Sequence, residues 1–256
     1  MDLGLTDRVF VVTAASTGLG LASARALVAE GAKVVLVARR ADALAAAVDS
    51  LTTRVDHADR AVSLAADLAD PDAPQRAVDL ALQAHGRLDG ALVSVGGPPR
   101  GSVLDTPDAQ WLESFGSVFL PALRTARAVV AAQPAGRLGF VLSTSVKAPL
   151  AQMAISNGLR PGLGMLVKQL ADEIGPQGGR AFGLLPGSVA TERLEQLWSG
   201  AGDPVAAREQ AAASIPLRRL GDPDEFGRVA AFLLSDAASY VTGCLVPVDG
   251  GVMRAL

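Results

Sequence analysis

The chain has 256 residues, of which 50% are hydrophobic and 19% charged, a length and composition that favour one large globular domain. Its formal net charge of −3 and the lack of a long basic run argue against nucleic acid as a partner. The one cysteine, Cys244, excludes an internal disulfide, and with only two histidines besides it a Cys- or His-rich metal site is not expected.

The amino terminus predicts neither export nor membrane insertion. The first seven residues carry two acidic side chains and lack the basic and apolar regions of a signal peptide. No uninterrupted apolar run approaches the about 20 residues that a membrane span requires. We therefore expect a cytoplasmic protein that acts on a small molecule, with no membrane, nucleic-acid or metal partner.

Short apolar runs alternate with longer amphipathic runs along the chain. This alternation predicts right-handed crossover connections and a parallel sheet with helices on both faces. The fold class is therefore α/β, a Rossmann-type, doubly wound sheet of seven strands in a single domain over residues 1–256. Strands are expected at 9–12, 33–37, 61–64, 90–95, 137–142, 180–185 and 244–248, and helices at 20–30, 42–51, 74–85, 109–132, 156–173 and 224–234.

A glycine-rich turn follows the first predicted strand. Gly18-Leu19-Gly20 ends this turn and opens a helix. Glycines let the backbone approach a pyrophosphate closely, and the free N–H groups of a helix N-terminus hold it. We expect a dinucleotide here, with a tight turn that has no binding role as the alternative.

The second predicted strand ends in Arg39 and Arg40, where a carboxylate would be expected to bond a ribose 2′-hydroxyl. A guanidinium makes paired, charge-assisted hydrogen bonds to a 2′-phosphate instead. The cofactor NADP(H) is thus favoured over NAD(H). The alternative is that both arginines are solvated residues at the start of a helix.

The segment 191–220, between the sixth and seventh strands, is long and mixes helix formers with Pro204 and Pro216. Ligands of such sheets lie beyond the carboxyl ends of the strands. We interpret this segment as a candidate substrate lid, with a structural pair of helices as the alternative.

Several motifs occur in an order that makes the whole chain resemble the short-chain dehydrogenase/reductases. They are Thr-x-x-x-Thr-Gly-Leu-Gly from Thr13, Asp67-Leu68, Gly96-Gly97, Pro186-Gly187-x-x-x-Thr191, and Ser239-Tyr240-Val241-Thr242-Gly243 ahead of Val248-Asp249-Gly250-Gly251.

The resemblance implies that Asp67 contacts the adenine, Gly96 passes close to the cofactor riboses, and Thr191 touches the nicotinamide carboxamide. Two departures concern this site. Ala14 stands at the family's first glycine, and Val93-Ser94-Val95-Gly96 replaces its Asn-Asn-Ala-Gly. The full cofactor-binding set is expected to be Thr13, Ser16, Thr17, Gly18, Leu19, Gly20, Arg39, Asp67, Leu68, Gly96, Pro186, Gly187 and Thr191.

At the catalytic positions the chain departs from the family it resembles. Typical members use a Tyr as the acid, with a Lys four residues later on the same helix face. The one tyrosine here, Tyr240, belongs to the carboxyl-terminal motif. Aligning back from Lys168 places Ser156 at the Tyr position and Arg160 at the Lys position.

Two further family positions are affected. The serine that polarises the carbonyl falls at Ser143, with Ser145 as the competitor if the alignment contains a gap. The helical Asn of the proton relay becomes Val118. The resemblance therefore implies a divergent branch with Ser-x-x-x-Arg in place of Tyr-x-x-x-Lys.

The replacement changes the available chemistry. Bringing a phenol from a pKa of about 10 to about 7 requires roughly 4 kcal/mol, whereas an aliphatic alcohol near 15.7 requires about 12 kcal/mol. Ser156 is thus a poor acid. Arg160 stays protonated and can hold an oxyanion, a carboxylate, a phosphate or a cofactor ribose. Lys147 could supply the proton if it were buried, and an exposed loop lysine is the alternative.

Two functions follow as hypotheses. The first is an NADP(H)-dependent oxidoreductase acting on a carbonyl/alcohol or enoyl-type substrate, in which Ser143 and Arg160 stabilise negative charge and solvent or Lys147 supplies the proton. The alternative is a non-catalytic dinucleotide-binding protein, a sensor or assembly partner. In either case we expect a homodimer or homotetramer, because helices 109–132 and 156–173 carry more apolar surface than one sheet can cover.

Overall fold

One parallel sheet of seven strands organises the protein. The computed structural model describes residues 2–53, 59–192, 194 and 203–254. The strand order is β3-β2-β1-β4-β5-β6-β7, and every pairing is parallel. This confirms the predicted doubly wound α/β fold. The strands are β1 (Val9–Thr13), β2 (Lys33–Ala38), β3 (Ala61–Ala65), β4 (Gly90–Val93), β5 (Arg137–Val141), β6 (Arg180–Pro186) and β7 (Cys244–Val248).

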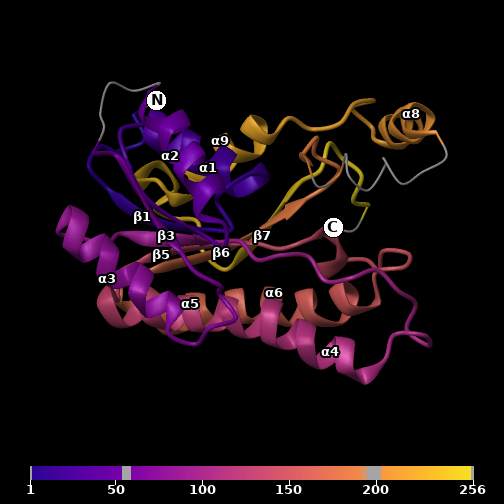
Figure 1. Ribbon diagram of the computed structural model, residues 1–256, viewed down its shortest axis with the longest axis horizontal. Coiled ribbons are helices and arrows are strands. Elements are labelled where there is room, and N and C mark those ends of the chain that lie inside the picture. The colour runs from indigo at the N-terminus through magenta and orange to yellow at the C-terminus, as the bar shows by residue number, and fades with distance from the viewer. Residues whose placement is uncertain (1, 54–58, 193, 195–202, 255–256) are drawn as a thin grey trace.

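Helices cover both faces of this sheet (Figure 1). The helices α1, α2 and α9 lie on one face, and α3, α5 and α6 lie on the other. The described helices are α1 (Gly18–Ala29), α2 (Ala41–Thr52), α3 (Ala73–His85), α4 (Asp108–Ser114), α5 (Leu120–Ala132), α6 (Ala154–Ile174), α8 (Pro204–Ser214) and α9 (Pro223–Leu234).

The central strand β1 shows why these strands are apolar throughout. All five of its residues are buried. Phe10 and Val12 belong to the core under α1, α2 and α9, whereas Val9 and Val11 belong to the core under α3, α5 and α6. A strand that is buried on both faces has no solvent side on which polar residues could alternate.

The run predicted as one helix over 109–132 consists of three elements, which corrects that prediction. Between α4 and α5 lies a π-helical turn (Phe115–Phe119), in which the N–H of Leu120 donates to the carbonyl of Phe115. Pro121 follows directly and has no N–H, so the α-helical hydrogen-bond pattern is interrupted at this point.

The helix α6, which carries Ser156 and Arg160, packs closely on this π-helical turn and on α4. A Cβ atom added to Gly158 would lie 2.6 Å from the Trp111 ring, and one added to Gly162 would lie 3.1 Å from the Phe119 ring. Each glycine costs a helix about 1 kcal/mol relative to alanine. Here the glycines let two aromatic rings seat directly against the helix backbone.

One helical run, Asp108–Ala132, is long and apolar enough by composition to cross a membrane. Its carboxyl-terminal half, α5, buries Ala122, Ala126 and Val129 in the core of the sheet. A core helix of a soluble protein passes the same test of length and composition.

The predicted lid, 191–220, contains α8. Asp203 caps this helix by accepting from the N–H groups of Val205 and Ala206, both at 3.0 Å. Pro204 therefore stands at the first helical position, where proline fits well. Residues 193 and 195–202 of the predicted lid lie outside the described residues, so its role as a lid stays a prediction.

Candidate active site

The glycine-rich turn between β1 and α1 has the shape of an anion-binding site. A Cβ atom on Gly20 would lie 2.5 Å from the Ala14 carbonyl oxygen, so only glycine fits there. Thr17 precedes the helix but makes no side-chain cap hydrogen bond, and the first turn of α1 holds no acidic residue. The N–H groups of this turn thus remain available to a phosphate.

Ala14 occupies a conformation that favours glycine. Its φ is 49°, in the left-handed region where an L-residue is strained by about 1–3 kcal/mol. The backbone therefore keeps the course that a glycine would follow, despite the substitution. The turn is preserved although the family's first glycine is not.

A cleft of about 1010 Å³ lies beside this turn, at the carboxyl ends of β1–β4. It brings together six predicted cofactor residues: Ser16, Thr17, Arg39, Asp67, Leu68 and Gly96. The cleft is also lined by Arg40 and Val118, which the sequence analysis singled out, and by Gly116, Ser117 and Arg124, which it did not. Three of these lining residues, Gly116, Ser117 and Val118, belong to the π-helical turn. The periodicity of the sequence did not predict this turn.

The other predicted cofactor residues are placed differently. Thr13 is fully buried, and its hydroxyl donates to the Ser94 carbonyl oxygen at 2.5 Å and accepts from the Ser94 N–H at 2.8 Å. It joins the ends of β1 and β4 and does not face the cleft, which corrects its predicted role. Leu19 is partly buried, with its side chain packed against the core.

The loop after β6 approaches the glycine-rich turn. A Cβ atom on Gly18 would lie 3.7 Å from the Thr191 side chain, so these two predicted residues are neighbours. Pro186 ends β6, and Gly187 donates its N–H to the Val248 carbonyl oxygen at 3.0 Å. A Cβ atom on Gly187 would lie 2.7 Å from the Asp249 Cα, so the close passage of the chain requires glycine.

At the catalytic positions the structure pairs Ser156 with Ser145. The Ser145 Oγ lies 3.1 Å from the Ser156 Oγ, and both residues are buried, at 4% and 2% exposure. Ser143 instead caps the short 3-10 turn Thr144–Val146, its hydroxyl accepting from the Ser145 N–H at 3.1 Å. Of the two serines that the sequence left open, the geometry favours Ser145 as the partner of Ser156.

Arg160 is a buried cation that bridges two strand ends. One guanidinium nitrogen donates to the Val141 carbonyl oxygen at 2.7 Å, and the other donates to the Gly96 carbonyl oxygen at 3.4 Å. Its exposure is 6%. The guanidinium therefore joins the end of β5 to the loop after β4, where the cofactor riboses are expected. Lys147, by contrast, is exposed, so the burial on which its role as proton donor depends is missing.

The arrangement can stabilise charge but contains no acid of suitable strength among these residues. Each hydroxyl of a serine pair is both donor and acceptor, so one can donate to the other while the second donates to a substrate oxygen. Val118, at the family's Asn position, is apolar and 2% exposed. Thus the described site offers a hydroxyl pair and a neighbouring positive charge in place of a phenol and an ammonium group.

Comparison with known proteins shows the family of the chain. A family model described as enoyl-(acyl carrier protein) reductase matches residues 13–253. L-rhamnose 1-dehydrogenase (NAD(P)(+)) of Azotobacter vinelandii is 33% identical over 253 residues, which cover 97% of both chains.

Two solved structures are also similar along their entire length. L-sorbose reductase of Gluconobacter frateurii, complexed with NADPH and L-sorbose, has a TM-score of 0.94 at 29% identity and covers 100% of both chains. A short-chain oxidoreductase of Pseudomonas aeruginosa PAO1, described as containing an atypical catalytic center, has a TM-score of 0.92 at 28% identity with the same coverage. From its fold, its glycine-rich turn and these relatives, the chain belongs to the short-chain dehydrogenase/reductase family of oxidoreductases.

Proposed function

We propose that the protein is an NADP(H)-dependent oxidoreductase that acts on a carbonyl/alcohol or enoyl-type substrate through a serine pair. The observation that carries this proposal is the contact of 3.1 Å between the Ser145 and Ser156 hydroxyls, at the helix position where the family has its tyrosine. The similarity to an oxidoreductase with an atypical catalytic center supports it.

The described residues fit a dinucleotide. The glycine-rich turn and the first turn of α1 would hold the pyrophosphate, Asp67 and Leu68 would border the adenine, and Thr191 would lie near the nicotinamide. When bound, the nicotinamide supplies or accepts the hydride. The protein's own task is then to orient the substrate and to stabilise the charge that develops on its oxygen.

The serine pair would perform that second task. A hydroxyl that donates to the substrate oxygen stabilises a developing alkoxide or enolate without losing its own proton. The proton that completes the reaction would come from solvent. This arrangement suits an enoyl-type substrate well, because the enolate can be stabilised by donors and then protonated at carbon by water.

Preference for NADP(H) over NAD(H) is the second part of this proposal. Arg39 and Arg40 are exposed and line the cleft at the end of β2, and neither makes a side-chain hydrogen bond or ion pair with any described residue. Their guanidinium groups are thus available to a 2′-phosphate. The NADPH complex of L-sorbose reductase supports the same choice.

The proposal is tested by mixing the purified protein with NADPH and a panel of aldehydes, ketones, quinones and enoyl thioesters. We expect NADPH consumption, monitored by the nicotinamide absorbance, with at least one substrate class. Saturable NADPH binding with no turnover across the panel would favour the alternative, a dinucleotide-binding protein without catalytic activity.

We further propose that the protein is a homodimer or homotetramer. Leu112 on α4, Phe115 on the π-helical turn and Met165 on α6 are 74%, 40% and 69% exposed. A second copy of the chain, which presents the same helices, would cover these side chains. Light scattering at micromolar concentration tests this, and a strictly monomeric mass would contradict it.

A further inference from the structure

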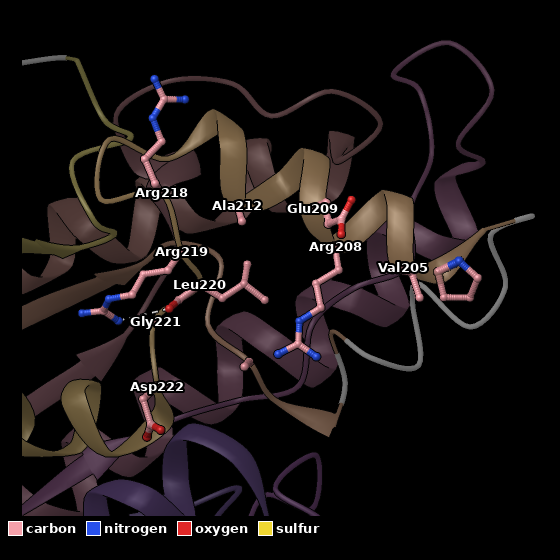
Figure 2. A pocket seen from close by; sticks show the side chains of 11 residues that line it. Val205, Arg208, Glu209, Ala212, Arg218, Arg219, Leu220, Gly221 and Asp222 are labelled. Atoms are coloured by element: carbon pink, nitrogen blue, oxygen red, sulfur yellow. Dashed lines mark hydrogen bonds between the residues drawn. The ribbon is translucent and has the colours of Figure 1, made fainter.

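A second cavity, distinct from the cleft beside the glycine-rich turn, lies between α8 and the loop that precedes α9 (Figure 2). Its volume is about 780 Å³. Three arginines line it: Arg208 comes from α8, and Arg218 and Arg219 come from the loop. Apolar side chains complete the wall, among them Val205, Ala212 and Leu220. Two acidic residues, Glu209 and Asp222, also line it, so the arginines outnumber the carboxylates by one.

Two of the three arginines are already engaged. Arg219 makes two bonds of 2.7 Å to the carboxylate of Glu225, which holds the pKa of Glu225 at about 2. Arg218, in a left-handed conformation with φ of 57°, donates to the Ala213 carbonyl oxygen at the end of α8. These contacts tie the loop to α9 and to α8, and they shape the cavity.

Arg208 is not engaged in this way. Its side chain makes no hydrogen bond or ion pair with the residues that the structure describes. Figure 2 shows it extending from α8 toward the loop of Leu220, Gly221 and Asp222, while Glu209 extends in another direction. No acidic residue stands three or four positions from Arg208 on the helix, so the helix itself offers it no partner.

The wall of the cavity is connected along the chain to the predicted cofactor site. Ala190 lines the cavity and donates its N–H to the Gly221 carbonyl oxygen at 2.9 Å. The next residue, Thr191, lies against Gly18 of the glycine-rich turn. One residue of the cavity wall is therefore followed directly in the chain by the residue that is expected to border the nicotinamide.

We propose that this cavity binds an anionic group of the substrate, a carboxylate or a phosphate, with Arg208 as its charge partner. This inference rests on the proposed function, because the bound molecule is the one whose carbonyl or enoyl group is reduced. The guanidinium would make charge-assisted hydrogen bonds to the anion, and the apolar wall would contact the carbon chain that joins the anion to the reacting carbon.

The first test measures binding alone. The protein is saturated with NADPH, so that the pyrophosphate site is filled, and is titrated with inorganic phosphate by calorimetry, with sodium chloride of equal ionic strength as the reference. We expect saturable binding to the wild type, binding weakened about tenfold in Arg208→Gln, and binding largely retained in Arg208→Lys. Arg127→Gln removes an exposed arginine of α5 and should bind as the wild type does.

The second test separates this proposal from the proposed function. Reduction of 4-oxopentanoate is compared with reduction of its methyl ester in the wild type and in Arg208→Gln. We expect KM to rise about tenfold for the acid only, with kcat little changed. Equal KM changes for acid and ester, or phosphate binding that Arg208→Gln leaves intact, would overturn the anion site while leaving the proposed function standing. Phosphate binding that depends on Arg208, with no turnover of any substrate, would uphold the site as an anion site and remove the proposed function.

Discussion

The two ends of the same parallel sheet use charge in opposite ways. At the amino ends of the strands, arginines and aspartates are paired with each other. Asp89, just before β4, accepts from Arg8 at 2.9 Å, from Arg87 at 2.7 and 2.8 Å, and from the Val9 N–H at 2.8 Å. Arg8 also bonds Asp236 at 3.0 Å, and Asp236 bonds Arg137, the first residue of β5.

We call these ion pairs at the amino ends of the strands the amino-terminal network. Burial of the charged groups in this region indicates that their role is structural. Arg180, the first residue of β6, is 6% exposed and donates to the Leu233 and Ser235 carbonyl oxygens, both at 2.8 Å. Burial lowers its pKa to about 10. Burial also raises the pKa of Asp89, but the hydrogen bonds from Arg87, Val9 and Arg8 outweigh that effect and hold the pKa below its usual value.

By contrast, Arg39 and Arg40 at the carboxyl end of β2, and Arg208 on α8, line cavities and have no side-chain partner among the described residues. Residue type alone therefore does not indicate a ligand site in this chain. The arginines at the amino ends are held by carboxylates or by backbone carbonyl oxygens, whereas those that line the cavities are the ones for which we propose ligands.

The largest effect is expected at the amino-terminal network. Asp89→Ala leaves Arg8 and Arg87 without their shared carboxylate, and we expect the free energy of unfolding to fall by about 2 kcal/mol, less than for a fully buried pair because both arginines are partly exposed. Urea denaturation measures this change. The NADPH affinity of the folded variant should match that of the wild type. A selective loss of that affinity would contradict the assignment of a purely structural role to the charges at the amino ends of the strands.

The effect of Asp89→Ala on stability should depend on pH. The pKa of Asp89 is lowered in the folded state, so its contribution to stability is present above the unfolded carboxyl pKa of about 4 and is lost as the pH falls through the folded value. The wild type and Asp89→Ala should therefore converge in stability under acid conditions. A difference that stays constant from pH 7 to pH 2 would contradict this assignment.

Arg160 differs from these exposed arginines, because it lies near the carboxyl ends of β4 and β5 and yet is buried and hydrogen-bonded. Arg160→Ala removes the link between Val141 and Gly96, and we expect turnover of the native substrate to fall by more than tenfold. Ser156→Ala should cost less, because Ser145 retains a hydroxyl at the same place. Steady-state kinetics measure both. Full activity in Arg160→Ala, with a correctly folded protein, would mean that the bridge has no part in the reaction.

Arg39 lies at the carboxyl end of β2, and its substitution is expected to affect cofactor binding and not stability. Arg39→Asp removes the charge-assisted partner of a 2′-phosphate and adds a repulsive carboxylate, so the preference for NADPH over NADH should shift by about tenfold or reverse. Calorimetric titration with both cofactors measures the shift. The unfolding free energy should remain within about 0.5 kcal/mol, because the side chain is exposed. Equal affinities for NADPH and NADH in the wild type would contradict this prediction.

The fold could be predicted because burial on both sheet faces forces the strands to be apolar, as in β1. The turn at Gly18 and Gly20 could be predicted because backbone crowding restricts the residue type. The choice between Ser143 and Ser145 could not be made from the sequence, since it depends on a 3-10 turn that buries one serine and exposes part of the other. Likewise, the charge of Arg160 is visible in the sequence, but its direction toward two carbonyl oxygens is set only by the packing of α6.

The smallest effect is expected from restoring the family's residues. Ser156→Tyr with Arg160→Lys should gain less than tenfold in the reduction of ordinary ketones. A phenol at position 156 needs space that a side chain 2% exposed does not have, and a lysine ammonium cannot reproduce the planar fork that joins Val141 to Gly96. Val118 offers no polar group to continue a proton relay, and Pro161 brings no N–H to the next turn. Initial rates with a ketone panel, compared with those of each single variant, measure the outcome. The contrary outcome is strong ketone reduction by the double variant together with full native activity in Arg160→Ala. It would mean that Ser156 and Arg160 are remnants of a lost site and that the native reaction depends on other residues at the carboxyl ends of the strands.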